Sequence, residues 1–170
     1  MFALSKIRTV DDFPKKGIKF FDITTVLNDA ESFQELFNAL LLKAHELKPD
    51  VITALEARGY FFAPALALAL KIPFVPIRKK GKLPYKTFLE QYELEYGKET
   101  IEVHQDAIKP NQRILIFDDI LATGGTASAA AKLMQHFTPQ NINFLFLIEL
   151  SFLKGKEQIA AFDVESLFVV

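Results

Sequence analysis

Apolar residues follow two patterns along the chain. Helical spacing predicts helices, and short uninterrupted runs predict strands. In residues 28–47, apolar side chains return at helical spacing, which predicts an amphipathic helix. Asn28, three residues before Glu31, resembles a capping box at the start of this helix, and Pro49 follows its end. Two further helices are expected, at 60–70 and at the Ala-rich residues 126–137. Short apolar runs predict strands at 51–55, 73–77, 114–117 and 143–150. This alternation indicates an α/β fold with a mostly parallel central sheet flanked by helices.

Residues 79–104 interrupt the alternation. They are rich in charge and are punctuated by glycine and proline. Two short alternating runs, 92–96 and 100–104, predict a mobile loop that leads into a hairpin turning at Gly97-Lys98. No internal repeat or interdomain linker is visible, so we expect one domain over residues 1–170.

Composition narrows the classes of function. Half of the residues are hydrophobic, with 17 Phe and no Trp, which is enough for a buried core. A net charge of −1 argues against a nucleic acid as partner but allows a small anionic ligand. The absence of Cys excludes disulfides, thiolate metal sites and Cys nucleophiles, and the three His are scattered. The longest apolar run is far below the ~20 residues that a bilayer needs, and no export signal is visible, so we expect a cytoplasmic protein without a membrane partner.

The strongest candidate for chemistry is the segment 114–126. A buried strand leads to Asp118 and Asp119, and a small turn then opens a helix. The N–H groups of such a turn, at the positive end of a helix, favour a phosphate, while two carboxylates can accept the vicinal hydroxyls of a ribose. The expected 5-phosphate residues are Ala122, Thr123, Gly124, Gly125 and Thr126. The alternative is a charged strand end with an ordinary turn; the segment is neither a Walker A loop nor a dinucleotide fingerprint.

Two other segments follow expected strands and could bind an anion. Glu56-Ala57-Arg58-Gly59 is a strand-to-helix turn, although a helix cap with a surface Glu–Arg pair would look the same. Residues 78–84 place four cations on a loop with glycine and proline, which could equally be a solvated loop. The position of residues 78–84 after a parallel strand favours a role in binding pyrophosphate.

The segment 114–126 resembles the phosphoribosyl-pyrophosphate motif of the type I phosphoribosyltransferases. Four more segments, at 13–24, 56–59, 78–84 and 94–97, are similar to the adenine-specific branch of that family and occur in the same order. The resemblance implies a small N-terminal hood over about residues 1–28 and a flexible catalytic loop over about residues 82–104.

The resemblance also implies roles for individual residues. Glu95 is the catalytic carboxylate and Tyr96 its loop partner, with Glu93 as the weaker candidate. The residues implied for pyrophosphate are Glu56, Ala57, Arg58, Arg78, Lys79 and Lys82, with a cis peptide bond at Glu56-Ala57. The residues implied for adenine are Ile18, Lys19 and Phe20, with Phe20 stacking on the base. Lys19 stands where the family often has an apolar residue, and Phe21 where it often has Arg, so the resemblance does not fix the details of base recognition or of the hood position.

The activity implied is that of purine salvage: adenine and 5-phosphoribosyl 1-pyrophosphate give AMP and pyrophosphate. Magnesium is the expected cofactor, without an assigned protein ligand, and a homodimer is the expected assembly. The sequence leaves two alternative functions open. A phosphoribosyltransferase for hypoxanthine or xanthine would keep the segment 114–126, and a ligand-sensing regulator would keep the fold without catalysis. The segments 56–59 and 94–97 disfavour the first, and the near-zero net charge disfavours the second.

Overall fold

The computed structural model describes residues 4–13, 15–17, 19–94, 97–138 and 140–170. The chain divides into two compact units, Met1–Leu41 and Leu42–Val170. None of the described helices is long and apolar enough to cross a membrane.

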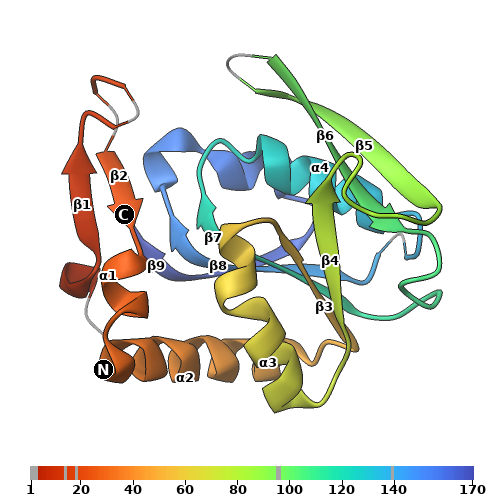
Figure 1. Ribbon diagram of the computed structural model, residues 1–170, viewed down its shortest axis with the longest axis horizontal. Helices are drawn as coiled ribbons and strands as arrows, with labels where there is room; N and C mark the ends of the chain where they lie inside the picture. Colours follow the sequence, from red (N-terminus) through yellow and green to blue (C-terminus); the bar gives the residue numbers. More distant parts are fainter. Residues whose placement is uncertain (1–3, 14, 18, 95–96, 139) are drawn as a thin grey trace. The chain divides into compact units, whose positions relative to one another are not determined.

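A seven-stranded sheet organises the second unit (Figure 1). Its strands in spatial order are β5 (Thr87–Leu94), β6 (Gly97–His104), β4 (Phe74–Lys79), β3 (Val51–Leu55), β7 (Ile114–Leu121), β8 (Ile142–Glu149) and β9 (Asp163–Val169). The five strands from β4 to β9 are parallel to their neighbours, whereas β6 and β5 are antiparallel. The mixed, mostly parallel sheet confirms the predicted fold class.

The chain order of the strands reverses between β3 and β7. From β3 the chain passes through the 3-10 helix η2 (Arg58–Phe61) and α3 (Ala63–Leu70) to β4 on one side. From β7 it passes through α4 (Gly125–Met134) to β8 on the other side. Right-handed crossovers in opposite directions put α3 and α4 on opposite faces of the sheet. Ligands of open parallel sheets bind at such a reversal, beyond the carboxyl ends of the strands.

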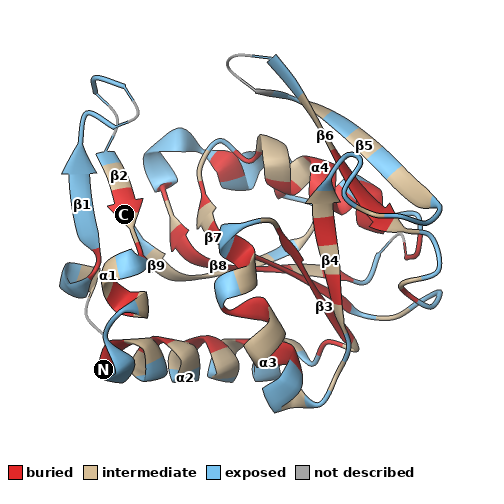
Figure 2. Ribbon diagram, in the orientation of Figure 1, coloured by how far each residue is buried: buried red, intermediate tan, exposed pale blue. Residues whose placement is uncertain are grey.

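The core lies around the central strands (Figure 2). All five residues of β3 and the first four of β7 are buried, because helices cover both faces of a parallel sheet. Buried Ala127, Ala129, Ala130 and Ala131 line α4. Alanine side chains allow the helix to approach the sheet closely, which explains the Ala-rich sequence.

The first unit contains a small antiparallel ribbon of β1 (Arg8–Asp11) and β2 (Lys19–Asp22). The short helices η1 (Leu4–Lys6) and α1 (Thr24–Leu27) lie before and after the ribbon in the chain. The long helix α2 (Ala30–Leu47) follows and continues into the second unit. Asp29 caps α2 by accepting the Ser32 N–H at 2.8 Å, so the predicted capping box at Asn28 is wrong.

Several expected boundaries are corrected by the structure. The helix expected from residue 60 begins as η2 and becomes α-helical only at Ala63. Strand β7 continues to Leu121, so Asp118 and Asp119 lie inside the strand. In the hairpin Leu94 pairs with Gly97, so Gly97-Lys98 belongs to β6 and is not the turn. The ribbon β1–β2 and strand β9 were not predicted, while the remaining 3-10 helices are η3 (Ser151–Leu153) and η4 (Gly155–Ile159).

Candidate active site

A pocket of about 200 Å³ lies at the reversal of strand order. All five residues predicted to hold a 5-phosphate line it, because they form the turn from β7 into α4. The lining residues are Arg58, Asp118, Ile120, Leu121, Ala122, Thr123, Gly124, Gly125, Thr126, Ala127 and Phe146. The N-terminus of α4, which is ten residues long, contributes unpaired backbone N–H groups to this turn. The pocket is therefore suited to a small anion.

The turn keeps its shape because two glycines pack against each other. Gly124 has a φ of +84°, which side chains rarely adopt, and a Cβ there would meet the Gly155 carbonyl and the Gln158 Cβ, the latter at 2.9 Å. A Cβ on Gly155 would in turn collide with the Ala122 carbonyl oxygen and lie 2.9 Å from the Gly124 nitrogen. Gly155, the first residue of η4, was not among the predicted site residues. Its only sequence signal is a Lys-Gly turn after β8, about thirty residues beyond the segment it supports.

The two predicted ribose carboxylates face different surroundings. Neighbouring residues of a strand point to opposite faces of the sheet, and only Asp118 of the pair lines the pocket. Asp119 is 1% exposed and forms an ion pair with Arg58, whose Nε lies 2.8 Å from Asp119 Oδ2. The Asp119 N–H donates to Asp118 Oδ1 at 2.9 Å.

Burial raises the pKa of both carboxyls. For Asp118 the charge of Asp119 adds to this effect, and the pKa lies well above the usual range. For Asp119 the guanidinium of Arg58 opposes it, although the pKa is still raised. A cation beside the pocket, such as a sugar that develops positive charge, would favour the ionised form of Asp118.

The turn after β3 holds the other predicted anion residues. The peptide bond between Glu56 and Ala57 is cis, as the resemblance implied. Gly59 lies so close to β7 that a Cβ would be 3.2 Å from the Phe117 carbonyl oxygen and 3.3 Å from Asp118 Oδ1. Arg58 lines the pocket, whereas Ala57 is exposed and Glu56 faces the next strand, β4.

Glu56 connects this turn to residues 78–84, the basic segment, which begins at the end of β4. Its Oε2 accepts a hydrogen bond from Arg78 Nε at 2.9 Å, and its Oε1 accepts one from the Lys79 N–H at 2.8 Å. Burial pushes the pKa of Glu56 upward, but the Lys79 N–H and the Arg78 guanidinium outweigh burial and lower it. Lys79 Nζ lies 2.8 Å from Glu99 Oε1, which raises the pKa of Lys79, and the side chain of Lys82 is exposed.

The basic segment and the pocket share one edge of the sheet. Strands β4, β3 and β7 are adjacent and parallel, so their carboxyl ends lie together. The structure thereby brings the predicted pyrophosphate residues next to the predicted 5-phosphate residues, without Arg78, Lys79 or Lys82 lining the pocket itself.

The hairpin of β5 and β6 runs beside α4 (Figure 1). Phe88 of β5 stacks on His136 with ring centroids 4.2 Å apart and meets Phe137 edge-on at 5.4 Å. Tyr92 is hydrogen-bonded to Thr126 of the turn from β7 into α4 (residues 122–126, the phosphate turn). Burial raises the pKa of Tyr92. The predicted catalytic residues Glu95 and Tyr96 lie outside the described residues, and the weaker candidate Glu93 is exposed.

The predicted adenine residues belong to the first unit. Ile18 lies outside the described residues. Lys19 is exposed, with its Nζ 3.9 Å from Asp11 Oδ1. Phe20 meets Phe13 edge-on, with ring centroids 5.1 Å apart. Phe21, which stands where the family often has Arg, is buried.

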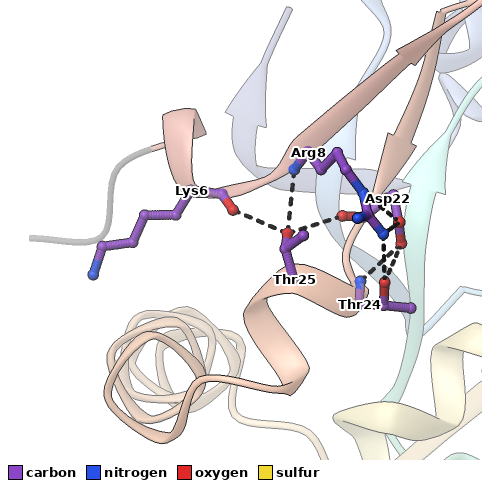
Figure 3. Close-up of polar contacts among 5 residues, drawn as sticks. All are labelled: Lys6, Arg8, Asp22, Thr24 and Thr25. Atoms are coloured by element: carbon purple, nitrogen blue, oxygen red, sulfur yellow. Dashed lines mark hydrogen bonds and ion pairs between the residues drawn. The ribbon is translucent and has the colours of Figure 1, made fainter.

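Asp22, at the end of the same strand, ties the ribbon to α1 (Figure 3). It accepts hydrogen bonds from Arg8 Nε at 3.0 Å and from Thr24 Oγ1 at 2.6 Å. The hydroxyl of Thr24, followed by the Arg8 guanidinium, lowers the pKa of Asp22 to about 2. Thr25 Oγ1 accepts the Arg8 N–H and donates to the Lys6 carbonyl, so five residues form one connected network.

Comparison with known proteins decides the family. Residues 24–165 match the phosphoribosyl transferase domain. The chain is 52% identical to the adenine phosphoribosyltransferase of Desulfitobacterium hafniense over 95% of this chain and 93% of the relative. The chain belongs to the adenine phosphoribosyltransferases.

Solved structures of the family agree with this assignment. The adenine phosphoribosyltransferase of Thermoanaerobacter pseudethanolicus superposes with a TM-score of 0.91 at 44% identity, covering 99% of this chain and 100% of the other. The enzyme of Saccharomyces cerevisiae, solved with an imino-altritol bisphosphate and adenine, gives a TM-score of 0.88 at 38% identity, covering 94% and 93%. Family and enzyme class predicted from the sequence are both confirmed.

The described residues offer few oxygen donors for the magnesium ion that the resemblance implies. Within the part of the chain that the structure describes, no three His, Asp or Glu side chains gather as a metal site. Asp118, a carboxylate on the pocket wall, is one suitable donor. Magnesium is commonly held by one or two carboxylates together with substrate phosphates and waters, so the residues fit an ion carried mainly by its substrate.

Proposed function

We propose that this chain transfers the phosphoribosyl group of 5-phosphoribosyl 1-pyrophosphate to adenine, giving AMP and pyrophosphate in purine salvage. One observation carries the proposal: an anion pocket with Asp118 on its wall lies at the sheet reversal of a chain 52% identical to a curated adenine phosphoribosyltransferase. A binding protein without catalysis would need the phosphate turn but not the catalytic loop segment 94–97.

The 5-phosphate binds in the turn of residues 122–126. The backbone N–H groups there and the hydroxyls of Thr123 and Thr126 donate to its oxygens, and the helix dipole of α4 favours its charge. Because the phosphate does not react, its binding energy serves to hold the anomeric carbon in place.

The pyrophosphate leaves toward the basic edge of the sheet. Arg58, Arg78, Lys79 and Lys82 supply positive charge to a leaving group that gains negative charge as its bond to carbon breaks. Glu56 does not approach the pyrophosphate, because like charges repel. It holds Arg78 and the Lys79 N–H in position instead.

The ribose lies between these two sites. As pyrophosphate departs, the sugar becomes oxocarbenium-like, and the carboxylate of Asp118 stabilises that charge while accepting ribose hydroxyls. Asp119 completes the ribose site by fixing Arg58 and by donating its N–H to Asp118. A bound magnesium ion would be held by Asp118 and substrate oxygens, and it would neutralise part of the pyrophosphate charge.

Adenine is held by Ile18, Lys19 and Phe20, with Phe20 against its flat face. Glu95 takes the proton from the imidazole ring of the base as its nitrogen bonds to the sugar, and Tyr96 assists it. The loop of about residues 82–104 closes over the site and excludes water, which would otherwise hydrolyse the activated sugar. We further propose a single domain over 1–170 with its hood at about 1–28, a homodimer, and a cytoplasmic location.

A base panel tests the proposal. The purified chain receives donor, magnesium and adenine, hypoxanthine or xanthine in turn, and nucleotides are separated by chromatography. We expect AMP from adenine and no nucleotide from the other bases. IMP or XMP as the main product would favour an enzyme for another base, and no nucleotide at all would favour a regulator. The double substitution Asp118→Asn with Asp119→Asn should abolish turnover, whereas Asp106→Asn, at an exposed residue outside the pocket, should not.

A further inference from the structure

Glu102 is a buried carboxylate outside the pocket. It lies in β6, is 3% exposed, and pairs in register with Arg78 of β4 on one side and Leu89 of β5 on the other. A buried carboxylate needs hydrogen-bond donors, because removing its charge from water is costly. Its donors come from the loop between β4 and β5 and from the first residue of β5.

The carboxylate binds that loop at its backbone. Glu102 Oε1 accepts the N–H groups of Lys82 at 2.8 Å and of Leu83 at 2.9 Å. Glu102 Oε2 accepts the hydroxyl of Thr87 at 3.3 Å, where β5 begins. One side chain therefore fixes the end of the basic segment and the start of the hairpin.

Glu56 fixes the beginning of the same segment, through Arg78 Nε and the Lys79 N–H. Between the two carboxylates the backbone turns, with the Lys82 N–H donating to the Lys79 carbonyl at 3.3 Å. Arg78 Nη1 donates to the Lys82 carbonyl at 3.4 Å. The cations are thus carried on a backbone that is anchored at both ends before any ligand arrives.

We propose that Glu102 is a positioning residue for the pyrophosphate of the donor. Its carboxylate holds the Lys82–Leu83 backbone so that the loop is ordered in advance, and less conformational entropy is lost when the pyrophosphate binds. Glu102 does not touch the substrate, since it is buried and carries the same sign of charge. The inference rests on the proposed function, which assigns this segment to the pyrophosphate.

Substitutions at Glu102 distinguish the contribution of its hydrogen-bond acceptors from the contributions of its volume and charge. Glu102→Met keeps the length of the side chain but accepts no backbone N–H, whereas Glu102→Gln retains an oxygen that accepts both. Glu165→Gln is the matched control, since Glu165 lies in β9, outside the loop of about residues 82–104, with its Oε2 2.9 Å from Lys43 Nζ. The measurements are KM for the donor, KM for adenine, and the dissociation constant of pyrophosphate alone.

We expect Glu102→Met to raise the donor KM and the pyrophosphate dissociation constant at least tenfold, with the adenine KM changed less than threefold. Glu102→Gln and Glu165→Gln should stay within threefold of the wild type. An unchanged donor KM in Glu102→Met, or an equal rise in both KM values, overturns the proposal, as does a Gln variant as impaired as the Met variant. If the wild type makes no AMP, the proposed function is wrong. If the variants are active, the changes in their KM values test the role of Glu102 separately.

Amide hydrogen exchange of the ligand-free wild type covers the case in which Glu102→Met does not fold. We expect the Lys82 and Leu83 amides to exchange at least tenfold more slowly than in an unstructured chain, because both donate to a buried carboxylate. Exchange at the unstructured rate would overturn the proposal.

Discussion

Replacing Gly155 by Ala tests whether the phosphate turn depends on a glycine that lies outside it. The added Cβ would collide with the Ala122 carbonyl oxygen and lie 2.9 Å from the Gly124 nitrogen. Both neighbours are backbone atoms of the turn, so no side-chain rotation can relieve the overlap. Gly155→Ala must therefore displace either the turn or the start of η4.

The cost follows from overpacking of a filled site, which is about 1–3 kcal/mol. If it falls on the turn, the affinity for the 5-phosphate drops roughly 5- to 150-fold, at about 1.4 kcal/mol for each factor of ten. Isothermal titration with ribose 5-phosphate measures the loss, and thermal unfolding measures the part that falls on global stability. Ala160→Val, which adds carbons at an exposed residue near the end of η4, serves as the control and should leave both unchanged.

An affinity within twofold of the wild type, together with an unchanged Tm, would show that the added Cβ is accommodated. It would mean that the turn and η4 move apart without cost, and that the contact between Gly124 and Gly155 does not shape the pocket.

Three further outcomes follow from the site and its surroundings. Glu95→Gln should lower kcat by about 10²- to 10⁴-fold while AMP binding changes little, and Glu93→Gln should not; steady-state kinetics with AMP titration compares them, and equal losses would move the proton transfer elsewhere. Phe20→Ala should raise the KM for adenine and leave the donor KM unchanged; a normal adenine KM would place the stacking contact on another residue. The pKa of Asp22 is lowered to about 2 from an ordinary 3.8, so its stabilisation is complete above pH 4 and is lost as the pH falls toward 2. Chemical unfolding should therefore show Asp22→Asn less stable than the wild type at pH 6, by at most about 2 kcal/mol, with the gap closing near pH 2; a gap independent of pH would contradict the assignment.

The fold could be predicted wherever a local pattern decided it. The apolar runs of β3 and β8 and the periodicity of α2 are visible in the sequence and recur in the structure. The hairpin was also foreseen, but its turn was misplaced, because Gly97 looks like a turn residue and actually opens β6. Strand β9 was missed although it ends in the apolar run 167–170, because its first half carries Asp163, Glu165 and Ser166 and its burial is intermediate along most of its length.

The site residues could be predicted only where a sequence motif directly follows an expected strand. The turn of residues 122–126, which the sequence assigns to a phosphate, lines the pocket. The different surroundings of Asp118 and Asp119 could not be foreseen, because they depend on β7 continuing through both residues. Gly155 and Glu102 were invisible for another reason: each acts on residues distant in sequence, through contacts that only the folded chain brings together.

The stoichiometry of the products shows whether the chain transfers the phosphoribosyl group to adenine. Labelled adenine is incubated with the wild-type chain, 5-phosphoribosyl 1-pyrophosphate and magnesium, and AMP and pyrophosphate are quantified over time. We expect both products to appear in a one-to-one ratio and only when adenine is present. Release of pyrophosphate without AMP, or no release at all, would contradict it.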